Sequence, residues 1–484
     1  NVSMTGGCLP ILIQMPILIA LYQAIRRPLT YMFNVPYKDV PADVIEALAV
    51  EYATTKPACL LPGLGPQRTL NGEQNCRSFA MLACLTGNVG VAGGSAGAVS
   101  YLKESHAGVE FLPMKNPCPG AIPSFLWSRA VERPETIDRQ AGLTGAEKLE
   151  TGIKTIFCLA SGMLVNQHSH VNETVRILEQ EDLAETIVVS DLFMTPGARY
   201  ADLLLPGVSF FETENVVNPW AGGDYVLYDH QAVKPLFGAR LEYEWMLAAA
   251  DQLGCGQAFC QGTREAGEWL ARRYEEHRSR REPALPPFEV LRRQGGFVYP
   301  QTADTPAFQR NIRDKEPFAT PSGKIEIFSQ RLYDSGVLPG VPCYTPCEEG
   351  WEDACAGPYP LQLIGYHSKR RCHSIGELTE SLKGLDEQQL WMHPRDAGPR
   401  GIRDGDLVEV FNSRGVVCLP VWVTERIVPG TVAMSEGAWF TPDAKGRDRR
   451  GCINVLTMFH RATPLAHGNP QHTNLVQVRL AMEK

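Results

Sequence analysis

The stretch IKTIFCLASGMLVNQHSHVNETVRILEQ, residues 153–180, decides the fold of this chain. Residues 153–160 form a nearly continuous apolar run, which is typical of a buried parallel strand. A Ser-Gly turn and a run of polar residues then lead into a helix. Two further short apolar strands follow at Thr186–Ser190 and Ala201–Leu205. Strand, helix, strand, short crossover and strand is the pattern of a doubly wound α/β sheet.

Polar residues gather where these strands end. Ligands of open α/β sheets bind outside the carboxyl ends of the strands. That edge carries Ser161, Gly162, Asn166, Gln167, His168, Asp191 and Thr195. The carboxylate of Asp191 suits a ribose diol or a guanine edge, and the first helical turn near residues 166–169 suits a phosphate. A helix cap and a loop aspartate satisfied by its own neighbours explain the same residues equally well.

Upstream, the sequence predicts helices at Val40–Tyr52 and Asn71–Thr86, with a short strand at Ala58–Leu61 between them. The glycine-rich stretch GNVGVAGGSAG, residues 87–97, predicts a loop. Such loops bring backbone N–H groups close to a phosphate, although a plain connector has the same composition.

The C-terminal part of the chain has a different pattern. Residues 343–359 are rich in Pro, Gly and acidic residues, as a domain linker is. Short strands follow, among them LQLIG at residues 361–365 and two strands around a turn at Asn412–Gly415. Strands at this spacing predict a closed β-barrel. These patterns divide the chain into an apolar segment, two stretches of α/β type, a linker and a barrel, at residues 1–33, 34–86, 87–342, 343–360 and 361–484.

Charge and cysteine usage exclude some classes of function. The net charge is -8 and no Lys/Arg block is long enough for a nucleic-acid arm, so we expect no nucleic-acid partner. None of the 14 cysteines forms a CxxC pair. A metal site at Cys343, Cys347 and Cys355 lacks an evident fourth ligand, so scattered structural thiols and no metal are predicted.

The N-terminal segment has a character of its own. Residues 8–25 are uncharged and reach the lower edge of a membrane-spanning length, although Pro10 and Pro16 break the first turns. A buried helix of a soluble protein is the alternative. The string GGCLPILIQMPILIALY resembles a segment of the YidC-type membrane-insertase family over about the first 25 residues. We interpret residues 1–33 as foreign to the rest of a chimeric chain.

Residues 34–484 resemble the catalytic subunit of anaerobic dimethyl sulfoxide reductases, which are molybdopterin oxidoreductases. The strings that carry this resemblance occur in the family's order: EYATTKPACLLPGLGPQRTLNGEQ, LTGNVGVAGG, LVNQHSHVNET, ADLLLP, TPSGKIEIFSQ, EGAWFTPDAKGRDRRGCINVLT and GNPQHTNLVQV. The resemblance implies a molybdenum ion held by two molybdopterin guanine dinucleotides. It also implies α/β domains that bind the guanosines and a C-terminal, double-psi-like barrel that covers the pterins. For the two α/β stretches it implies that residues 34–86 are the end of a domain and that residues 87–342 bind a dinucleotide.

The family's motifs assign cofactor contacts to three stretches of this chain. The first is the sheet edge, with Gly162, Asn166, Gln167, His168, Ser190, Asp191 and Thr195. The second is the loop GYHSKRRCHS, with Gly365, Tyr366, His367, Arg371, His373 and Ser374. The third is the terminal stretch, with Asn469, His472 and Asn474. In the loop, a guanidinium can pair with phosphate oxygens, and a carboxamide suits a pterin edge. A solvated basic loop is the alternative for the second stretch.

The resemblance begins downstream of the family's cysteine cluster for a [4Fe-4S] centre and of the serine that ligates molybdenum. No catalytic residue or metal ligand is therefore assigned here, and we expect the chain alone to be an inactive fragment. The implied reaction is the reduction of sulfoxides or N-oxides by oxygen-atom transfer in anaerobic respiration. The implied partners are an iron–sulfur electron-transfer subunit and a quinol-oxidising membrane anchor, on the periplasmic face of the inner membrane.

Two other functions fit the same sequence. Selenate or another oxyanion is an alternative substrate within the family. A non-catalytic cofactor-binding or structural subunit is an alternative from another class.

Overall fold

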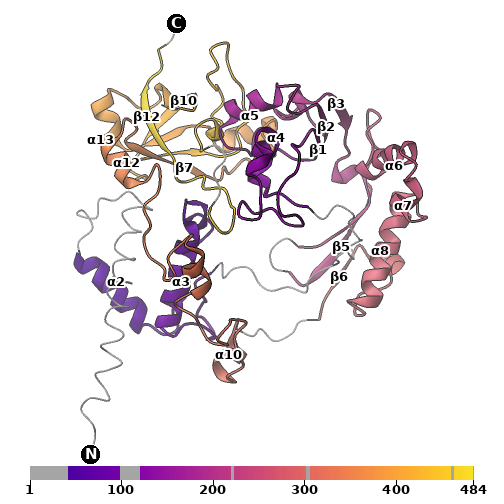
Figure 1. Cartoon of the computed structure of the whole chain (residues 1–484), viewed down its shortest axis with the longest axis horizontal. Coiled ribbons are helices and arrows are strands. Elements are labelled where there is room, and N and C mark those ends of the chain that lie inside the picture. Colours follow the sequence, from indigo (N-terminus) through magenta and orange to yellow (C-terminus); the bar gives the residue numbers. More distant parts are fainter. Residues whose placement is uncertain are drawn as a thin grey trace, which may run out of the picture.

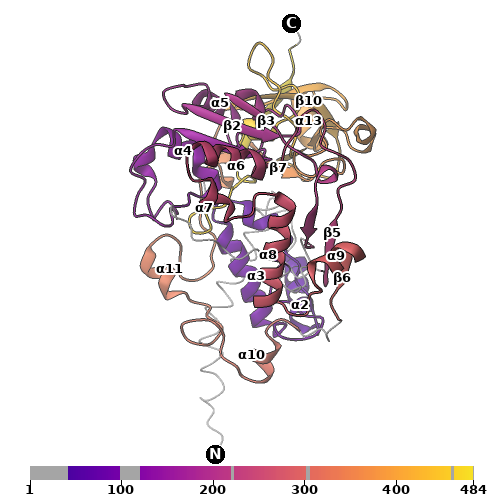
Figure 2. The same ribbon diagram turned by 90° about the vertical axis from the view of Figure 1, so that its right-hand side faces the viewer.

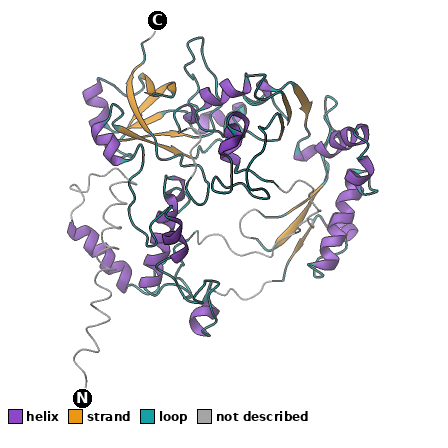
Figure 3. Ribbon diagram, in the orientation of Figure 1, coloured by secondary structure: helices purple, strands orange, loops and turns teal. Residues whose placement is uncertain are grey.

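The computed structural model describes residues 42–98, 109, 120–219, 223–300, 306–458 and 463–482. The insertase-like segment at residues 1–33 lies outside these ranges. Within them, no helix combines the length and apolar character needed to cross a lipid bilayer. The described strands form a parallel sheet, an antiparallel sheet and a closed barrel, which occupy separate places in Figure 3.

The parallel sheet is formed by β1 (Thr155–Leu159), β2 (Thr186–Asp191) and β3 (Leu203–Pro206), in that order. The predicted strands are thus confirmed to within a few residues. Helix α5 (Val171–Leu178) connects the first two strands and buries Ile177 and Leu178. The strand order advances in one direction only, so among the described residues the sheet lacks the reversal that defines a doubly wound sheet.

Helix α6 (Glu242–Gln252) reaches the other face of this sheet. Phe157 of β1 stacks on Trp245 of α6 with ring centroids 6.2 Å apart. Ser190 of β2 donates a hydrogen bond to Glu242 over 2.9 Å. Helices α5 and α6 therefore lie on opposite faces, as the α/β class requires.

The antiparallel sheet divides the segment predicted as one domain at residues 87–342. It consists of β4 (Asn215–Val217), β5 (Tyr225–Asp229) and β6 (Gly296–Val298). A separate core joins it to α8 (Ala266–Arg280) and α9 (Phe288–Gln294). Figure 2 shows this unit away from the parallel sheet and the barrel.

The C-terminal barrel closes in the order β10-β8-β11-β7-β12-β9. Its strands run at Leu361–Tyr366 (β7), Leu390–Met392 (β8), Leu407–Asn412 (β9), Gly415–Val423 (β10), Thr431–Ser435 (β11) and Leu475–Leu480 (β12). The predicted barrel is confirmed, including the tight turn between β9 and β10. Two pairs are parallel, β7 with β11 and β8 with β10.

The barrel and the parallel sheet share one hydrophobic core. Val165 and Ile177 from the α/β unit belong to the same buried cluster as Leu363 and Val476 of the barrel. Figures 1 and 2 show the two units side by side. The α/β unit and the barrel are therefore packed together rather than joined only by the chain.

The remaining elements frame these units. Helices α2 (Ala42–Thr54) and α3 (Gly72–Leu85) confirm the two predicted N-terminal helices. The strand predicted at Ala58–Leu61 is wrong, because its backbone bonds to side chains of the glycine-rich loop: Ala58 N–H donates to Asn88 and Leu60 N–H to Ser95. Shorter helices are α4 (Trp127–Glu132), α7 (Gly256–Cys260), α10 (Gln309–Arg313), α11 (Gln330–Ser335), α12 (Trp351–Ala356) and α13 (Pro394–Ala397).

Candidate functional site

Two sheet edges carry the predicted site residues, and the first belongs to the parallel sheet. Strands β1 and β2 end together because Leu159 pairs with Ser190. Asp191 then turns its carboxylate back on its own loop, where it accepts from Leu192 N–H over 2.7 Å and from the Thr195 hydroxyl over 3.2 Å. The sequence left open the alternative that the Asp191 carboxylate forms its hydrogen bonds within its own loop, and these two bonds are of that kind.

The second edge belongs to the barrel. Strands β7 and β11 are parallel neighbours with Tyr366 opposite Ser435, so the loops that follow them leave from the same edge. The loops stay in contact, since a Cβ at Gly437 would lie 1.7 Å from the carbonyl oxygen of His373. Farther along, the Trp439 indole N–H donates to the Ser374 carbonyl over 3.1 Å.

The two edges meet. A Cβ at Gly162, just after β1, would lie 3.2 Å from Ser374 Oγ of the barrel loop. The Asn166 amide donates to the Ala438 carbonyl over 2.8 Å, and its oxygen accepts from Phe440 N–H over 3.1 Å. The loops that follow β1, β7 and β11 therefore form one junction between the α/β unit and the barrel.

Arg371 lies behind this junction rather than on its surface. Its side chain is fully buried, and it pairs with the buried carboxylate of Glu377 over 2.7 Å. It also donates to Gln388, to Ser435 over 2.8 Å and to the Glu436 carbonyl over 3.1 Å. These partners occupy its terminal donors and fix the loop, and the direct phosphate contact expected of Arg371 stays a prediction.

His168 is enclosed as well, and its predicted contact with the cofactor stays a prediction. It is fully buried, with Nδ1 beside the Ser169 carbonyl and Thr174 Oγ1, and Nε2 3.2 Å from Ser128 Oγ. Its ring packs edge-on against Trp127. Both ring nitrogens thus have protein partners. His168 therefore stabilises the loop after β1 through these buried contacts.

The third predicted stretch, with Asn469, His472 and Asn474, contacts the barrel edge, and these side chains are buried or half-buried. Asn474 is buried and uses both ends of its amide, accepting from Met458 N–H and donating to the Gln471 carbonyl. His472 accepts from Gly365 N–H over 3.3 Å, and Asn469 is buried nearby in the chain. A Cβ at Gly365 would meet Gln471 Nε2 at 3.0 Å. These residues shape the edge, and a direct contact with a ligand stays a prediction for them.

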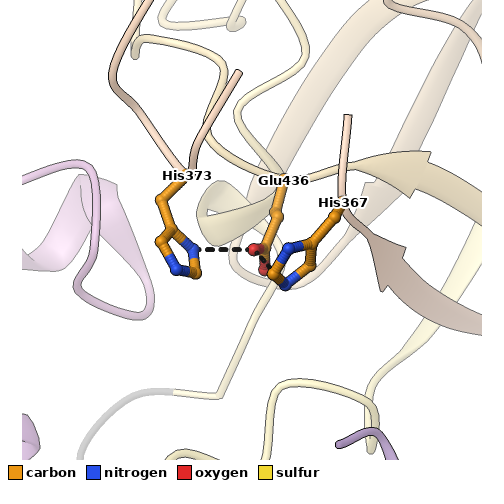
Figure 4. Close-up of side chains that lie close together, drawn as sticks. All are labelled: His367, His373 and Glu436. Atoms are coloured by element: carbon orange, nitrogen blue, oxygen red, sulfur yellow. Dashed lines mark hydrogen bonds and ion pairs between the residues drawn. The ribbon is translucent and has the colours of Figure 1, made fainter. Parts of the chain in front are cut away.

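Besides these buried residues, the junction carries polar side chains that are exposed to solvent. The side chains of His367 and His373 are 71% and 55% exposed, and both point at Glu436 (Figure 4). Gln471 holds the second carboxylate oxygen of Glu436 over 2.8 Å. Beneath them, burial raises the pKa of Tyr366 to about 12, so this phenol stays protonated. Sequence reasoning missed Glu436 although it opens the quoted string EGAWF, because a single glutamate after a strand carries no signal of its own.

Two buried histidines make the stability of the chain depend on pH. Burial lowers the pKa of His168 and of His472 to about 4, whereas an unfolded histidine titrates near about 6.5. Between these values the unfolded chain binds protons that the folded chain does not, so the free energy of unfolding falls as the pH falls. The loss of unfolding free energy approaches about 3 kcal/mol per histidine below pH 4.

Urea denaturation between pH 7 and 4.5 measures this loss of unfolding free energy. His168→Gln is expected to lose less stability on acidification than the wild type, and an equal loss would contradict this origin.

Two family models match these units. The molybdopterin oxidoreductase model matches residues 42–249, and the molybdopterin dinucleotide-binding domain model matches residues 361–475. The second match covers the barrel strands from β7 to β11 and the edge loops, and it ends at the first residue of β12. Both stretches of the chain are therefore similar to parts of molybdopterin oxidoreductases, the C-terminal one to their dinucleotide-binding domain.

Several curated relatives are similar to this chain over most of its length. The dimethyl sulfoxide reductase DmsA of Escherichia coli K12 is 43% identical over 91% of this chain and 55% of its own length. DmsA of Haemophilus influenzae is 41% identical over 91% of this chain and 56% of its own length. The trimethylamine-N-oxide reductase of the same species is 28% identical over 91% of this chain and 57% of its own length. This chain is thus similar to dimethyl sulfoxide reductases, and it spans little more than half the length of these relatives.

A solved structure shares the fold. Acetylene hydratase from Pelobacter acetylenicus superposes with a TM-score of 0.55 at 20% identity, over 74% of this chain and 46% of its own. At that identity the likeness concerns the arrangement of the chain and not its chemistry.

Proposed function

We propose that the junction of the α/β unit and the barrel binds a molybdopterin guanine dinucleotide cofactor. The observation that carries this proposal is the meeting of the loop after β1 with the loops after β7 and β11, through Gly162 against Ser374 and through Asn166 against Ala438. A dinucleotide is long and needs contacts from more than one loop. Two sheets whose parallel strands end at one place offer such contacts.

The chemistry of the junction fits an anionic group of this kind. Behind the loop, Glu377 is the single carboxylate among three guanidinium groups, those of Arg370, Arg371 and Arg450, which lie 2.7–3.4 Å from it. This cluster carries a net positive charge, which raises the local concentration of anions. Glycines at the edge, such as Gly162, leave room for a ligand to approach the backbone.

The predicted contacts divide into three proposed roles. Residues that are not buried are proposed to touch the cofactor, Gly162, Gln167, His367, His373 and Ser374, and Tyr366 is proposed to contact it from beneath them. Asp191, Ser190 and Thr195 are proposed to lie near its guanosine. Buried residues are proposed to hold these loops in place: Asn166, His168, Arg371, Asn469, His472 and Asn474.

The proposed reaction is the reduction of a sulfoxide or an N-oxide by oxygen-atom transfer. When bound, the molybdenum cofactor supplies this chemistry itself, and the protein supplies binding, orientation and electrostatics. The printed activities of the relatives, dimethyl sulfoxide and trimethylamine N-oxide reduction, support this substrate class. Reduction of selenate or another oxyanion, and a non-catalytic cofactor-binding role, are the alternatives.

Further parts of the function rest on the family. We propose an iron–sulfur electron-transfer subunit and a quinol-oxidising membrane anchor as partners, at the periplasmic face of the inner membrane. A [4Fe-4S] cluster and the molybdenum ligand are proposed to belong to the share of the relatives' length that this chain does not match.

An acceptor panel tests the substrate class. Protein expressed from the intact gene in a molybdenum-replete host is assayed with a reduced viologen dye as donor. We expect turnover of dimethyl sulfoxide and trimethylamine N-oxide to exceed that of selenate. Turnover of selenate alone would point to the oxyanion alternative, and a cofactor-loaded protein inactive on all acceptors would point to the non-catalytic one.

Asn166→Leu tests the junction. The substitution removes the amide bonds to Ala438 and Phe440 and leaves buried backbone groups without partners, which costs about 1–3 kcal/mol for each. We expect bound guanosine monophosphate to fall severalfold per folded chain, measured after acid release. Asn311→Leu is the matched control, since the amide of Asn311 serves only an exposed turn. Equal cofactor content in the two variants would contradict the proposed role of the junction.

A further inference from the structure

Three potential metal ligands gather at the surface of the junction. The ligand atoms of His367, His373 and Glu436 all lie within 4.8 Å of one another. His367 Nε2 is 3.1 Å and His373 Nδ1 is 2.9 Å from the same oxygen of Glu436. Figure 4 shows both rings directed at this carboxylate from different sides.

The topology of the barrel explains the gathering. His367 follows β7 and Glu436 follows β11, and these strands are parallel neighbours. The backbone continues the pairing one step further, since Glu436 N–H donates to the Tyr366 carbonyl over 2.9 Å. His373 returns to the same edge because Gly437 lets its backbone pass in close contact. The cluster is therefore built by regular strand pairing and does not depend on a chance encounter of side chains.

Hydrogen bonds from neighbouring residues fix the position of Glu436. Gln471 Nε2 donates to the outer oxygen of Glu436 over 2.8 Å, and Arg371 donates to the Glu436 carbonyl over 3.1 Å. The Glu436 side chain is only 13% exposed, whereas both imidazoles are more than half exposed. Outer contacts of this kind orient the ligands of known metal sites. The cluster thus combines a fixed carboxylate with two imidazoles that solvent ions can reach.

We propose that His367, His373 and Glu436 form a binding site for a divalent transition-metal ion. Metal–nitrogen and metal–oxygen bonds of about 2.0–2.2 Å in a tetrahedral site separate neighbouring ligand atoms by about 3.3–3.5 Å. The two nitrogen–oxygen separations of 3.1 and 2.9 Å lie just below this range, and the two nitrogens lie within 4.8 Å of each other, so side-chain rotations have to open the cluster slightly around the ion. Imidazole and carboxylate ligands suit zinc and the neighbouring first-row metals. Three protein ligands leave one position open for water or an anionic oxygen.

This inference shares His367 and His373 with the proposed cofactor site, and it is tested separately from it. It concerns the chain without molybdopterin and rests on the three side chains alone. A cation here would also offset the negative charge of Glu436, which otherwise repels an anion bound at the same loops. Failure of metal binding would leave the cofactor proposal untouched, and failure of cofactor binding would leave the metal site untouched.

Cobalt titration of the cofactor-free chain tests the site. The chain is purified from a host that cannot make molybdopterin, and Co²⁺ binding is followed by its visible absorption. We expect stoichiometric binding with a spectrum of nitrogen and oxygen ligands, without the near-ultraviolet charge-transfer band of cobalt–thiolate bonds. Added Zn²⁺ is expected to displace the cobalt. A spectrum dominated by thiolate ligands would show that cysteines bind the metal and would overturn the assignment.

Matched variants identify the ligands. Loss of an outer-shell partner costs metal sites about 10–100-fold in affinity, so His373→Ala and Glu436→Gln are each expected to cost more than about 100-fold. Gln471→Ala is expected to cost about tenfold. His230→Ala, at another exposed histidine, is the control and should bind cobalt as the wild type does. Circular dichroism confirms that each variant is folded. Wild-type affinity in folded His373→Ala and Glu436→Gln would refute the site.

Discussion

Gly437→Ala is expected to lose most of the bound cofactor, more than tenfold relative to the wild type by the order-of-magnitude cost of a displaced binding loop. The new Cβ would lie 1.7 Å from the His373 carbonyl oxygen, a backbone atom that cannot rotate away. The backbone angle φ of +88° adds about 1–2 kcal/mol of strain for any residue with a side chain. The loop that carries His373 and Ser374 must therefore shift, which disturbs its contact with Gly162. Acid-released guanosine monophosphate per folded chain measures the loss.

Gly446→Ala separates this effect from backbone strain. Gly446 has a similar φ of +75°, but a Cβ there meets nothing within 4 Å. Its variant is expected to lose about 1–2 kcal/mol of stability and to keep its cofactor. Equal retention of cofactor by the Gly437 and Gly446 variants would show that the packing of the two barrel loops does not matter for binding.

Glu377→Ala is expected to destabilise the folded chain by about 3–5 kcal/mol. Its carboxylate and the Arg371 guanidinium are both almost completely buried and lie 2.7 Å apart. Removing the carboxylate leaves a buried cation without its counter-ion, beside the second guanidinium of Arg370. Because Arg371 also holds Ser435 and the Glu436 carbonyl, the barrel edge is expected to loosen with it. The midpoint of urea unfolding measures the effect.

Glu380→Ala is the matched control for this buried pair. Glu380 pairs with Lys383 on the surface, where its side chain is 80% exposed. Exposed pairs contribute about 0–1 kcal/mol, so this variant should unfold close to the wild type. A similar shift of the midpoint in both variants would mean that the charge of Glu377 is not needed to compensate Arg371.

Much of the fold could be predicted from the chain alone. The apolar run at residues 155–159 forms the predicted strand, although only Cys158 in it is buried, and the tight turn at residues 412–415 defines a hairpin of the barrel. The strand predicted at residues 58–61 failed because its hydrogen-bond partners, Asn88 and Ser95, come from a loop some thirty residues away. Local patterns carry no information about such a partner.

The candidate site was predictable in its location and less so in its roles. Strand ends indicate an edge, and Gly162 and Ser374 were assigned to edges that the structure brings together. Burial cannot be inferred from residue type, so Arg371 and His168 were expected to face a ligand although both are enclosed. Glu436 was overlooked for the opposite reason, since its importance arises only when β7 and β11 pair.

The most direct measurement is the cofactor content of the wild-type chain. The protein is purified from a molybdenum-replete host, and guanosine monophosphate, pterin and molybdenum are quantified after acid release. The account predicts stoichiometric amounts of all three in the folded chain. A folded chain that carries none of them, although a reference molybdenum enzyme from the same host is loaded, would contradict it.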